Sequence, residues 1–132
     1  MRYLLDTHTF IWKIVDSGRV PKNVYVATED PANDVFISAV SLWEIAIKTR
    51  KRKLDLGGLL NEDLIDLAER MGIRTIELSP EEAATYAGLA EDTHFDPFDR
   101  MLIWQAICRK MILVSGDPEF QRFVPDGLKL LW

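Results

Sequence analysis

Short apolar runs separated by amphipathic stretches make up the pattern of this chain. Each run has the length and the apolar character of a short buried β-strand. The five predicted strands cover Arg2–Asp6, Val35–Ser38, Ile73–Leu78, Met111–Ser115 and Leu128–Leu131.

The stretches between these runs carry apolar residues at helical spacing, first of all between Thr7 and about Val15. Ser41 stands three residues before Glu44, the spacing of a capping box, so we expect Ser41 to cap the helix that follows it. The other predicted helices cover Pro21–Glu29, Leu60–Met71, Ser79 to about Gly88, Phe98–Lys110 and a short segment after Pro118.

Strands that alternate with helices favour βαβ units, in which neighbouring strands run parallel. The crossover between two such strands is right-handed in nearly all proteins. We therefore predict an α/β fold, a three-layer α/β/α sandwich with a mainly parallel central sheet. The length is near the common size of one domain, so residues 1–132 are expected to form a single domain.

The cysteine content and the N-terminus bear on the cellular setting. The chain has one cysteine, Cys108, which rules out a disulfide within the chain and favours a reducing compartment. We expect Cys108 to be a small buried hydrophobe. The first apolar stretch is short and is interrupted by Asp6 and His8, so it resembles neither a signal peptide nor a membrane span. The expected location is the cytoplasm, away from membranes.

The net charge of -5 counts against a general nucleic-acid-binding module, because such modules neutralise phosphates with basic residues. The positive charge is nevertheless concentrated in one basic run, which consists of Lys48, Arg50, Lys51, Arg52 and Lys53. A run of this kind is typical of a solvated helix end, and it also suits an enzyme that holds phosphates beside an acidic metal site.

Acidic residues follow the predicted strands, where open α/β sheets bind their ligands. Asp6 ends the first strand, and Glu44 lies in the helix after the second. Asp99, with Asp96 just before it, opens the helix that leads to the fourth strand, and Asp117 follows that strand. Four segments far apart in the sequence are thus expected to deliver carboxylates to one edge of the sheet.

Each acid also has an ordinary structural interpretation. Asp6 and Asp117 suit turns, Glu44 suits a capping box, and an acid in the first turn of a helix complements the helix dipole. Asp6 is the sharpest exception, because a charge at the end of an apolar strand lies beside the core and is costly unless it is paired or bound to a metal. The four acids together favour a site.

The ligand types indicate the chemistry of that site. Clustered carboxylates repel one another unless a cation neutralises them, and oxygen ligands select hard ions such as Mg²⁺ or Mn²⁺. Such ions activate water for phosphodiester hydrolysis. With only His8 and His94 and no paired cysteines, zinc is not expected. His94 lies near Asp96 in the sequence and is a candidate for orienting a substrate phosphate.

Four segments resemble the motifs of the PIN-domain family, and in particular the VapC-type toxins of bacterial and archaeal toxin–antitoxin systems. They are Leu-Leu-Asp-Thr-His at 4–8, Ser-Leu-Trp-Glu-Ile-Ala-Ile-Lys at 41–48, His-Phe-Asp-Pro-Phe-Asp-Arg at 94–100 and Leu-Val-Ser-Gly-Asp at 113–117. The resemblance covers the whole chain, and the order and the spacing of all four segments fit. Any one segment would be weak evidence, but the set is specific.

The resemblance implies a metal-dependent endoribonuclease that arrests growth and is neutralised by a small protein antitoxin encoded beside it. The catalytic and metal-binding residues it implies are Asp6, Glu44, Asp99 and Asp117, and the implied cofactor is Mg²⁺ or Mn²⁺. The supporting residues are Asp96, Ser115, Thr7 and His94. The expected RNA-binding residues are Lys48, Arg50, Lys51, Arg52 and Arg100.

Four tryptophans and a high apolar fraction in a small domain suggest that a partner covers part of the surface, so we also expect a homodimer. The tryptophans themselves are expected in the core or in an interface, and base stacking is the less favoured role. Two other functions remain open. One is a receiver-like phosphoacceptor domain, and the other is a PIN domain that binds RNA without cutting it.

Overall fold

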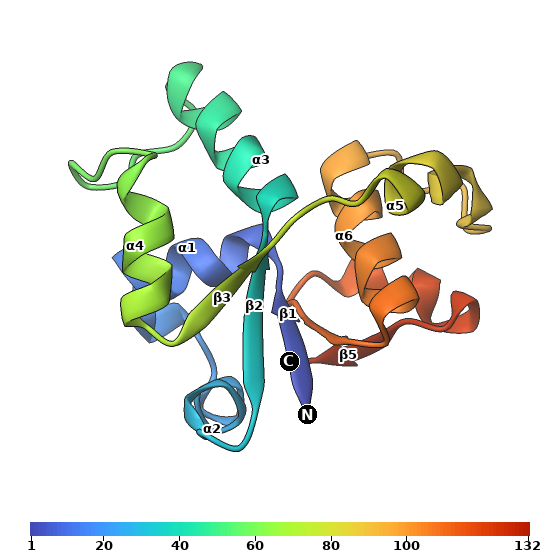
Figure 1. The fold of residues 1–132 in the computed structure, drawn as a ribbon, viewed down its shortest axis with the longest axis horizontal. Helices are drawn as coiled ribbons and strands as arrows, with labels where there is room; N and C mark the ends of the chain where they lie inside the picture. The colour runs from blue at the N-terminus through green and yellow to red at the C-terminus, as the bar shows by residue number, and fades with distance from the viewer.

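The computed structural model describes residues 1–132, and its centre is a five-stranded sheet in the order β3-β2-β1-β4-β5 (Figure 1). All four pairs of neighbouring strands are parallel. The strands are β1 (Arg2–Leu5), β2 (Asp34–Ser38), β3 (Ile73–Ile76), β4 (Ile112–Val114) and β5 (Lys129–Leu131). The predicted parallel sheet is therefore confirmed. β1, β3 and β4 end one or two residues earlier than predicted, whereas β2 and β5 end at the predicted residue.

Helices lie on both sides of this sheet, as the three-layer prediction requires (Figure 1). The α-helices are α1 (Thr7–Val15), α2 (Lys22–Glu29), α3 (Ala39–Arg50), α4 (Asp63–Arg70), α5 (Pro80–Thr85) and α6 (Pro97–Arg109). Three short 3₁₀-helices complete the chain: η1 (Ser17–Arg19), η2 (Tyr86–Gly88) and η3 (Pro118–Asp126). No helix has the length and apolar character needed to cross a membrane.

Each face of the sheet has its own hydrophobic core. Along β1, Leu5 packs into the core that contains Phe10 of α1 and Leu64 of α4. Leu4 packs into the other core, with Ile103 of α6. Successive side chains of a strand point to opposite faces, so a strand covered by helices on both faces is apolar at consecutive positions. This explains the continuous apolar runs of the sequence.

The start of α3 differs from the prediction. Ser38, not Ser41, caps this helix: its side chain accepts a hydrogen bond from the backbone N–H of Val40, at 3.1 Å. Because β2 ends at Ser38, the helix begins directly at the sheet edge, and the capping-box interpretation of Ser41 and Glu44 is wrong. Both residues lie inside the helix and are buried, so Glu44 is not a cap residue.

A capping box does form at α5, where Ser79 and Glu82 bond to each other's backbone N–H groups. Glu82 also accepts hydrogen bonds from Arg109 and from Gln105 of α6. Gln105 in turn accepts a bond of 2.6 Å from the hydroxyl of Ser38. This buried polar network therefore fixes α6 against both α5 and the start of α3, the helix that carries Glu44.

Two further expectations are corrected. Cys108 is exposed rather than buried, because it lies on the outer face of α6. The helix predicted over Leu60–Met71 begins only at Asp63, after a turn in which the carboxylate of Asp63 accepts a hydrogen bond from the backbone N–H of Leu60. The prediction began too early because the turn contains apolar residues, which were assigned to the apolar face of the helix.

Candidate active site

Asp6 stands where β1 meets α1 and is only 4% exposed. Its side chain caps α1 by accepting a hydrogen bond of 2.8 Å from the backbone N–H of Thr9. Burial raises the pKa of Asp6 above its usual value, although hydrogen bonds from Ser115 and Thr9 act in the opposite direction. A carboxylate whose charged form is disfavoured by burial is suited to binding a cation.

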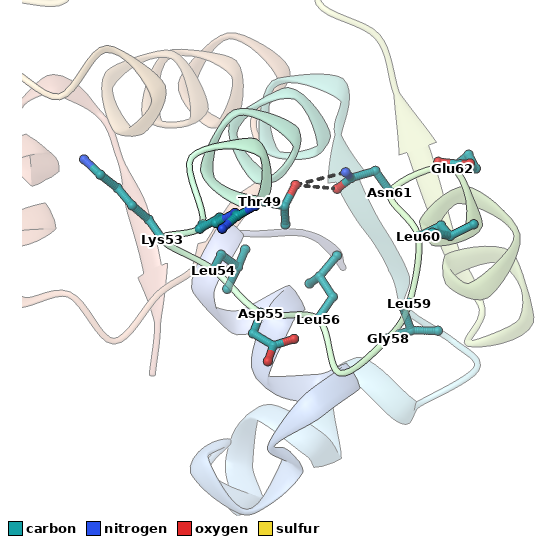
Figure 2. Close-up of a pocket in the computed structure, with 11 residues that line it drawn as sticks. Thr49, Lys53, Leu54, Asp55, Leu56, Gly58, Leu59, Leu60, Asn61 and Glu62 are labelled. Carbon is teal, nitrogen blue, oxygen red and sulfur yellow. Dashed lines mark hydrogen bonds between the residues drawn. The ribbon is translucent and has the colours of Figure 1, made fainter.

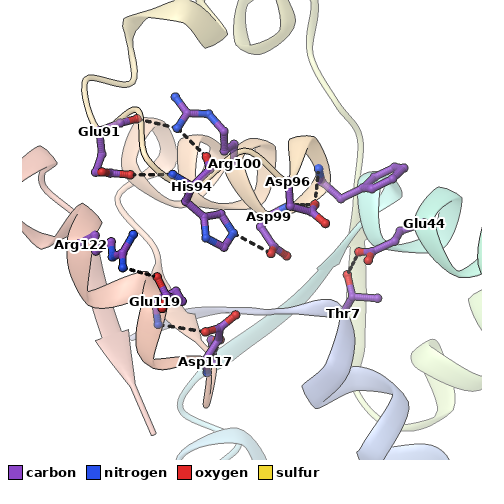
Figure 3. Close-up of polar contacts among 12 residues, drawn as sticks. Thr7, Glu44, Glu91, His94, Asp96, Asp99, Arg100, Asp117, Glu119 and Arg122 are labelled. Carbon is purple, nitrogen blue, oxygen red and sulfur yellow. Dashed lines mark hydrogen bonds and ion pairs between the residues drawn. The ribbon is translucent and has the colours of Figure 1, made fainter.

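Glu44 is 2% exposed and projects from α3 toward the start of α1 (Figure 3). The hydroxyl of Thr7 donates to Glu44 Oε1 at 2.7 Å, and it lies 2.9 Å from the hydroxyl of Ser41. The ammonium group of Lys48, one turn further along α3, pairs with the other carboxylate oxygen. Thr7 and Lys48 thus hold Glu44 in one orientation.

Asp99 lies in the first turn of α6, which Asp96 caps by accepting hydrogen bonds from the backbone N–H groups of Phe98 and Asp99. Its carboxylate is 3.0 Å from His94 Nε2. Burial, together with the charges of Asp96 and Glu44, raises the pKa of Asp99 to about 6, although the hydrogen bond with His94 acts in the opposite direction. The effect of Glu44 indicates that the two acids from α3 and α6 face a common space.

Asp117 follows β4 and caps η3, accepting a hydrogen bond of 2.9 Å from the backbone N–H of Glu119. Its own backbone N–H donates to the hydroxyl of Ser115, at 3.1 Å. Ser115 also lowers the pKa of Asp6, so its hydroxyl lies near the acids at the ends of both β1 and β4. Asp6 and Asp117 line one cavity of about 240 Å³.

The four acids converge on one edge of the sheet. Figure 3 shows the side chains of Glu44, Asp99 and Asp117 directed toward the space between α3, α6 and the start of η3. No three acidic, histidine or cysteine side chains lie close enough together to hold a metal ion as they stand. Each of the four acids bonds to a protein partner instead. The donor set itself, four carboxylates with the pKa of two raised by burial, fits a hard divalent cation.

The predicted RNA-binding residues fall into two groups. Arg100 donates to the backbone carbonyls of His94 and Leu89, so it holds the loop before α6. The three predicted residues beyond Lys48 are exposed and form no ion pair; they are Arg50, Lys51 and Arg52. The same holds for Lys53, which ends the basic run. Two of them, Arg52 and Lys53, border an open cavity of about 700 Å³ between α3 and α4 (Figure 2).

Sequence reasoning did not identify two of these contacts. Ser41 was taken for a cap, whereas it contacts the hydroxyl that orients Glu44. Gln105 carried no functional expectation, although it is fully buried and joins α6 to Ser38. The signal in the sequence was a polar residue among the apolar residues of the predicted helix 98–110. A polar side chain that is buried with them needs hydrogen-bond partners.

Comparison with known proteins gives the fold and the site a context. The family model described as "PIN domain" matches residues 3–124. Ribonuclease VapC22 of Mycobacterium tuberculosis is 30% identical over 114 residues, covering 86% of this chain and 85% of the relative.

The solved structures that share the fold include two with TM-scores of 0.70 or more. One is VapBC2 from Rickettsia felis bound to a DNA fragment from its promoter, with a TM-score of 0.72 and 20% identity over 99% of this chain and 98% of the other. The other is VapBC-1 from nontypeable Haemophilus influenzae, with a TM-score of 0.70 and 16% identity over 99% and 97% of the two chains.

Proposed function

The chain belongs to the PIN-domain family, and from this premise we propose that it is the toxin of a toxin–antitoxin pair, a metal-dependent endoribonuclease. The observation that carries the proposal is that four separate segments bring carboxylates to the carboxyl edge of one parallel sheet, three of which, Glu44, Asp99 and Asp117, are directed toward one space in Figure 3. The name of the relative, a ribonuclease, supports RNA as the substrate. Membership of this family replaces the receiver-domain alternative.

The proposed metal ligands are Asp6, Glu44, Asp99 and Asp117, and the proposed ion is Mg²⁺ or Mn²⁺. Such an ion neutralises charge on phosphate oxygens and lowers the pKa of water, which is the chemistry of phosphodiester hydrolysis. Oxygen-only ligands favour these ions over zinc, which prefers nitrogen and sulfur.

Other residues of the chain orient these acids. Thr7 holds one oxygen of Glu44 and Lys48 the other, whereas His94 contacts one oxygen of Asp99 and leaves its second oxygen open to other partners. Hydrogen bonds of this kind around a metal site fix the orientation of its ligands. Lys48 balances the charge of Glu44 and is proposed to contact a substrate phosphate beside it.

The exposed part of the basic run is proposed to hold the RNA. Arg50 lies six residues after Glu44 on α3, which places it about 9 Å further along the helix axis. A single-stranded RNA cut beside Glu44 would therefore pass these cations. Arg100 is left out of this surface, since its guanidinium is bonded to the carbonyls of the loop before α6.

A protein antitoxin and a second copy of the chain are the proposed protein partners. Exposed aromatic side chains support a surface that a partner protein covers: Trp43 is 61% exposed and Phe95 is 81% exposed. Trp43 and Phe98 also line an apolar cavity of about 270 Å³ beside α3 and α6. Expression of the chain alone should arrest growth, and co-expression of the neighbouring gene should relieve the arrest. Growth unaffected by the chain alone would contradict the toxin role.

The activity itself is tested with purified protein. RNA should be cleaved in the presence of Mn²⁺ or Mg²⁺, and EDTA should stop the cleavage. Single-stranded DNA of the same sequence serves as the comparison for the substrate. Cleavage that continues undiminished in EDTA would rule out the metal mechanism, and binding of RNA without any cleavage would support the inactive alternative.

A further inference from the structure

The cavity next to Asp6 and Asp117 is also lined by residues that have no role in the proposed hydrolysis of a phosphodiester. It holds about 240 Å³ and is lined, beside the two acids, by His8, Trp12, Gly116 and Pro118. At about 30 Å³ per water molecule, this volume corresponds to about eight waters. The cavity is therefore large enough to admit a single nucleobase.

One wall of the cavity is aromatic. His8 and Trp12 are four residues apart on α1, so they lie on the same face of that helix. Their ring centroids are 5.9 Å apart and the ring planes are inclined at 46°. Trp12 is itself held in place, since its ring lies 5.9 Å from that of Trp132 and the guanidinium of Arg19 stacks 4.5 Å above it. The aromatic wall is thus formed before any ligand arrives.

Another part of the lining depends on a residue without a side chain, Gly116. A Cβ atom added at Gly116 would lie 2.5 Å from the indole of Trp132, a distance that real side chains do not tolerate. The glycine therefore lets Trp132 pack against the turn that carries Asp117. In this position the ring of Trp132 also packs against the ring of Trp12.

The two carboxylates decide which part of a nucleotide suits the cavity. A cation held by Asp6 and Asp117 would draw the cleaved phosphate to the acidic side of the cavity, which leaves the side lined by His8 and Trp12 to the uncharged base of an adjoining nucleotide. On the premise of the proposed ribonuclease function, we propose that this cavity binds the base of a nucleotide flanking the cleaved phosphate, stacked against Trp12 and His8. Stacking of a base on an aromatic side chain tolerates any base, because every base has a π-face.

The test uses RNA oligonucleotides with one known cleavage site and an abasic ribose on either side of that site. On the wild-type protein, removal of one of the two flanking bases should lower kcat/KM by roughly tenfold to a hundredfold, the range given by a lost stacking contact. Trp12→Leu should lower kcat/KM for intact RNA by a similar factor and should make the enzyme indifferent to that abasic substitution. Trp12→Phe keeps an aromatic face and should restore most of the rate.

Trp43→Leu is the matched control, since Trp43 is exposed and lines a different cavity. For this variant, the abasic substitution should lower kcat/KM by the same factor as for the wild type. If Trp12→Leu lowers the melting temperature, His8→Ala takes its place in the test, because it changes an exposed side chain of the same wall. The same fall in kcat/KM and the same indifference to the abasic substitution are then expected. In an Asp99→Asn background, the affinity for intact RNA provides a second measurement that does not depend on turnover.

The outcomes separate this inference from the function on which it rests. Wild-type cleavage together with a Trp12→Leu variant that cuts intact RNA at the wild-type rate, or that keeps the abasic effect, would overturn the base-binding cavity alone. A wild-type protein that cleaves no RNA would overturn both.

Discussion

Replacement of Glu82 by glutamine tests the polar network that holds α6, and with it Asp99, against α5 and α3. Glutamine keeps the shape of the side chain and can still complete a capping box, so the change removes chiefly the negative charge. In the wild type, burial alone would raise the pKa of Glu82, but hydrogen bonds from Arg109, Ser79 and Gln105 outweigh it and lower the pKa to about 2.

The size of the effect follows from this lowered pKa. The gap between the ordinary value of 4.5 and about 2 corresponds to roughly 3 kcal/mol of stability at neutral pH. The side chain of Arg109 is 25% exposed, so solvent screening reduces the figure, and we expect Glu82→Gln to lower the free energy of unfolding by about 2 kcal/mol. Because the pKa is lower in the folded state, the stabilisation is complete above pH 4.5 and is lost as the pH falls toward 2.

Urea unfolding of wild type and Glu82→Gln at several pH values between 7 and 2 measures this difference. The two free energies of unfolding should be about 2 kcal/mol apart at pH 7 and should converge near pH 2. Glu81→Gln, an exposed acid in the same helical turn, is the control and should remain close to wild type at every pH. A difference between wild type and Glu82→Gln that stays constant with pH would refute the charge argument.

Two further predictions concern the site. Thr7→Val removes the hydroxyl that donates to Glu44 and should weaken Mn²⁺ binding by roughly tenfold to a hundredfold, measured by calorimetry, whereas Thr49→Val, whose hydroxyl bonds to the distant Asn61, should not. Replacing Arg50, Lys51 and Arg52 with alanine should reduce the slope of log affinity for single-stranded RNA against log salt by about 2, at about 0.7 per phosphate contact. An unchanged slope would assign the run to a solvated helix end.

The sequence predicted the fold well because the apolar pattern is strong. The five runs are apolar at consecutive positions, since helices cover both faces of the sheet, and this leaves little ambiguity about which segments are strands. The position of Asp6 followed directly from the end of β1. Strand ends were less accurate, because the residue after the last paired one, such as Ser115, is also buried.

Local hydrogen-bond geometry was harder to predict. Ser38 and Ser41 both precede the apolar face of α3, and only the end of β2 decides which of them caps the helix. Cys108 has apolar neighbours in the sequence, but the rotation of α6 places it outside. Arg100 is a cation next to a predicted ligand, yet its contacts are backbone carbonyls from a loop whose path no sequence pattern specifies.

The central claim, that the acids form one cation site, is tested most directly by thermal melts with and without Mn²⁺. The wild type should gain about 2.7 kcal/mol at a concentration 100-fold above its dissociation constant. Asp99→Asn and Asp6→Asn should gain much less, and without metal Asp99→Asn should melt higher than wild type, because one of the mutually repelling charges is gone. Asp92→Asn, at an exposed position of the preceding loop, should match wild type. An Asp99→Asn protein that melts lower without metal yet keeps the full Mn²⁺ increment would contradict the account.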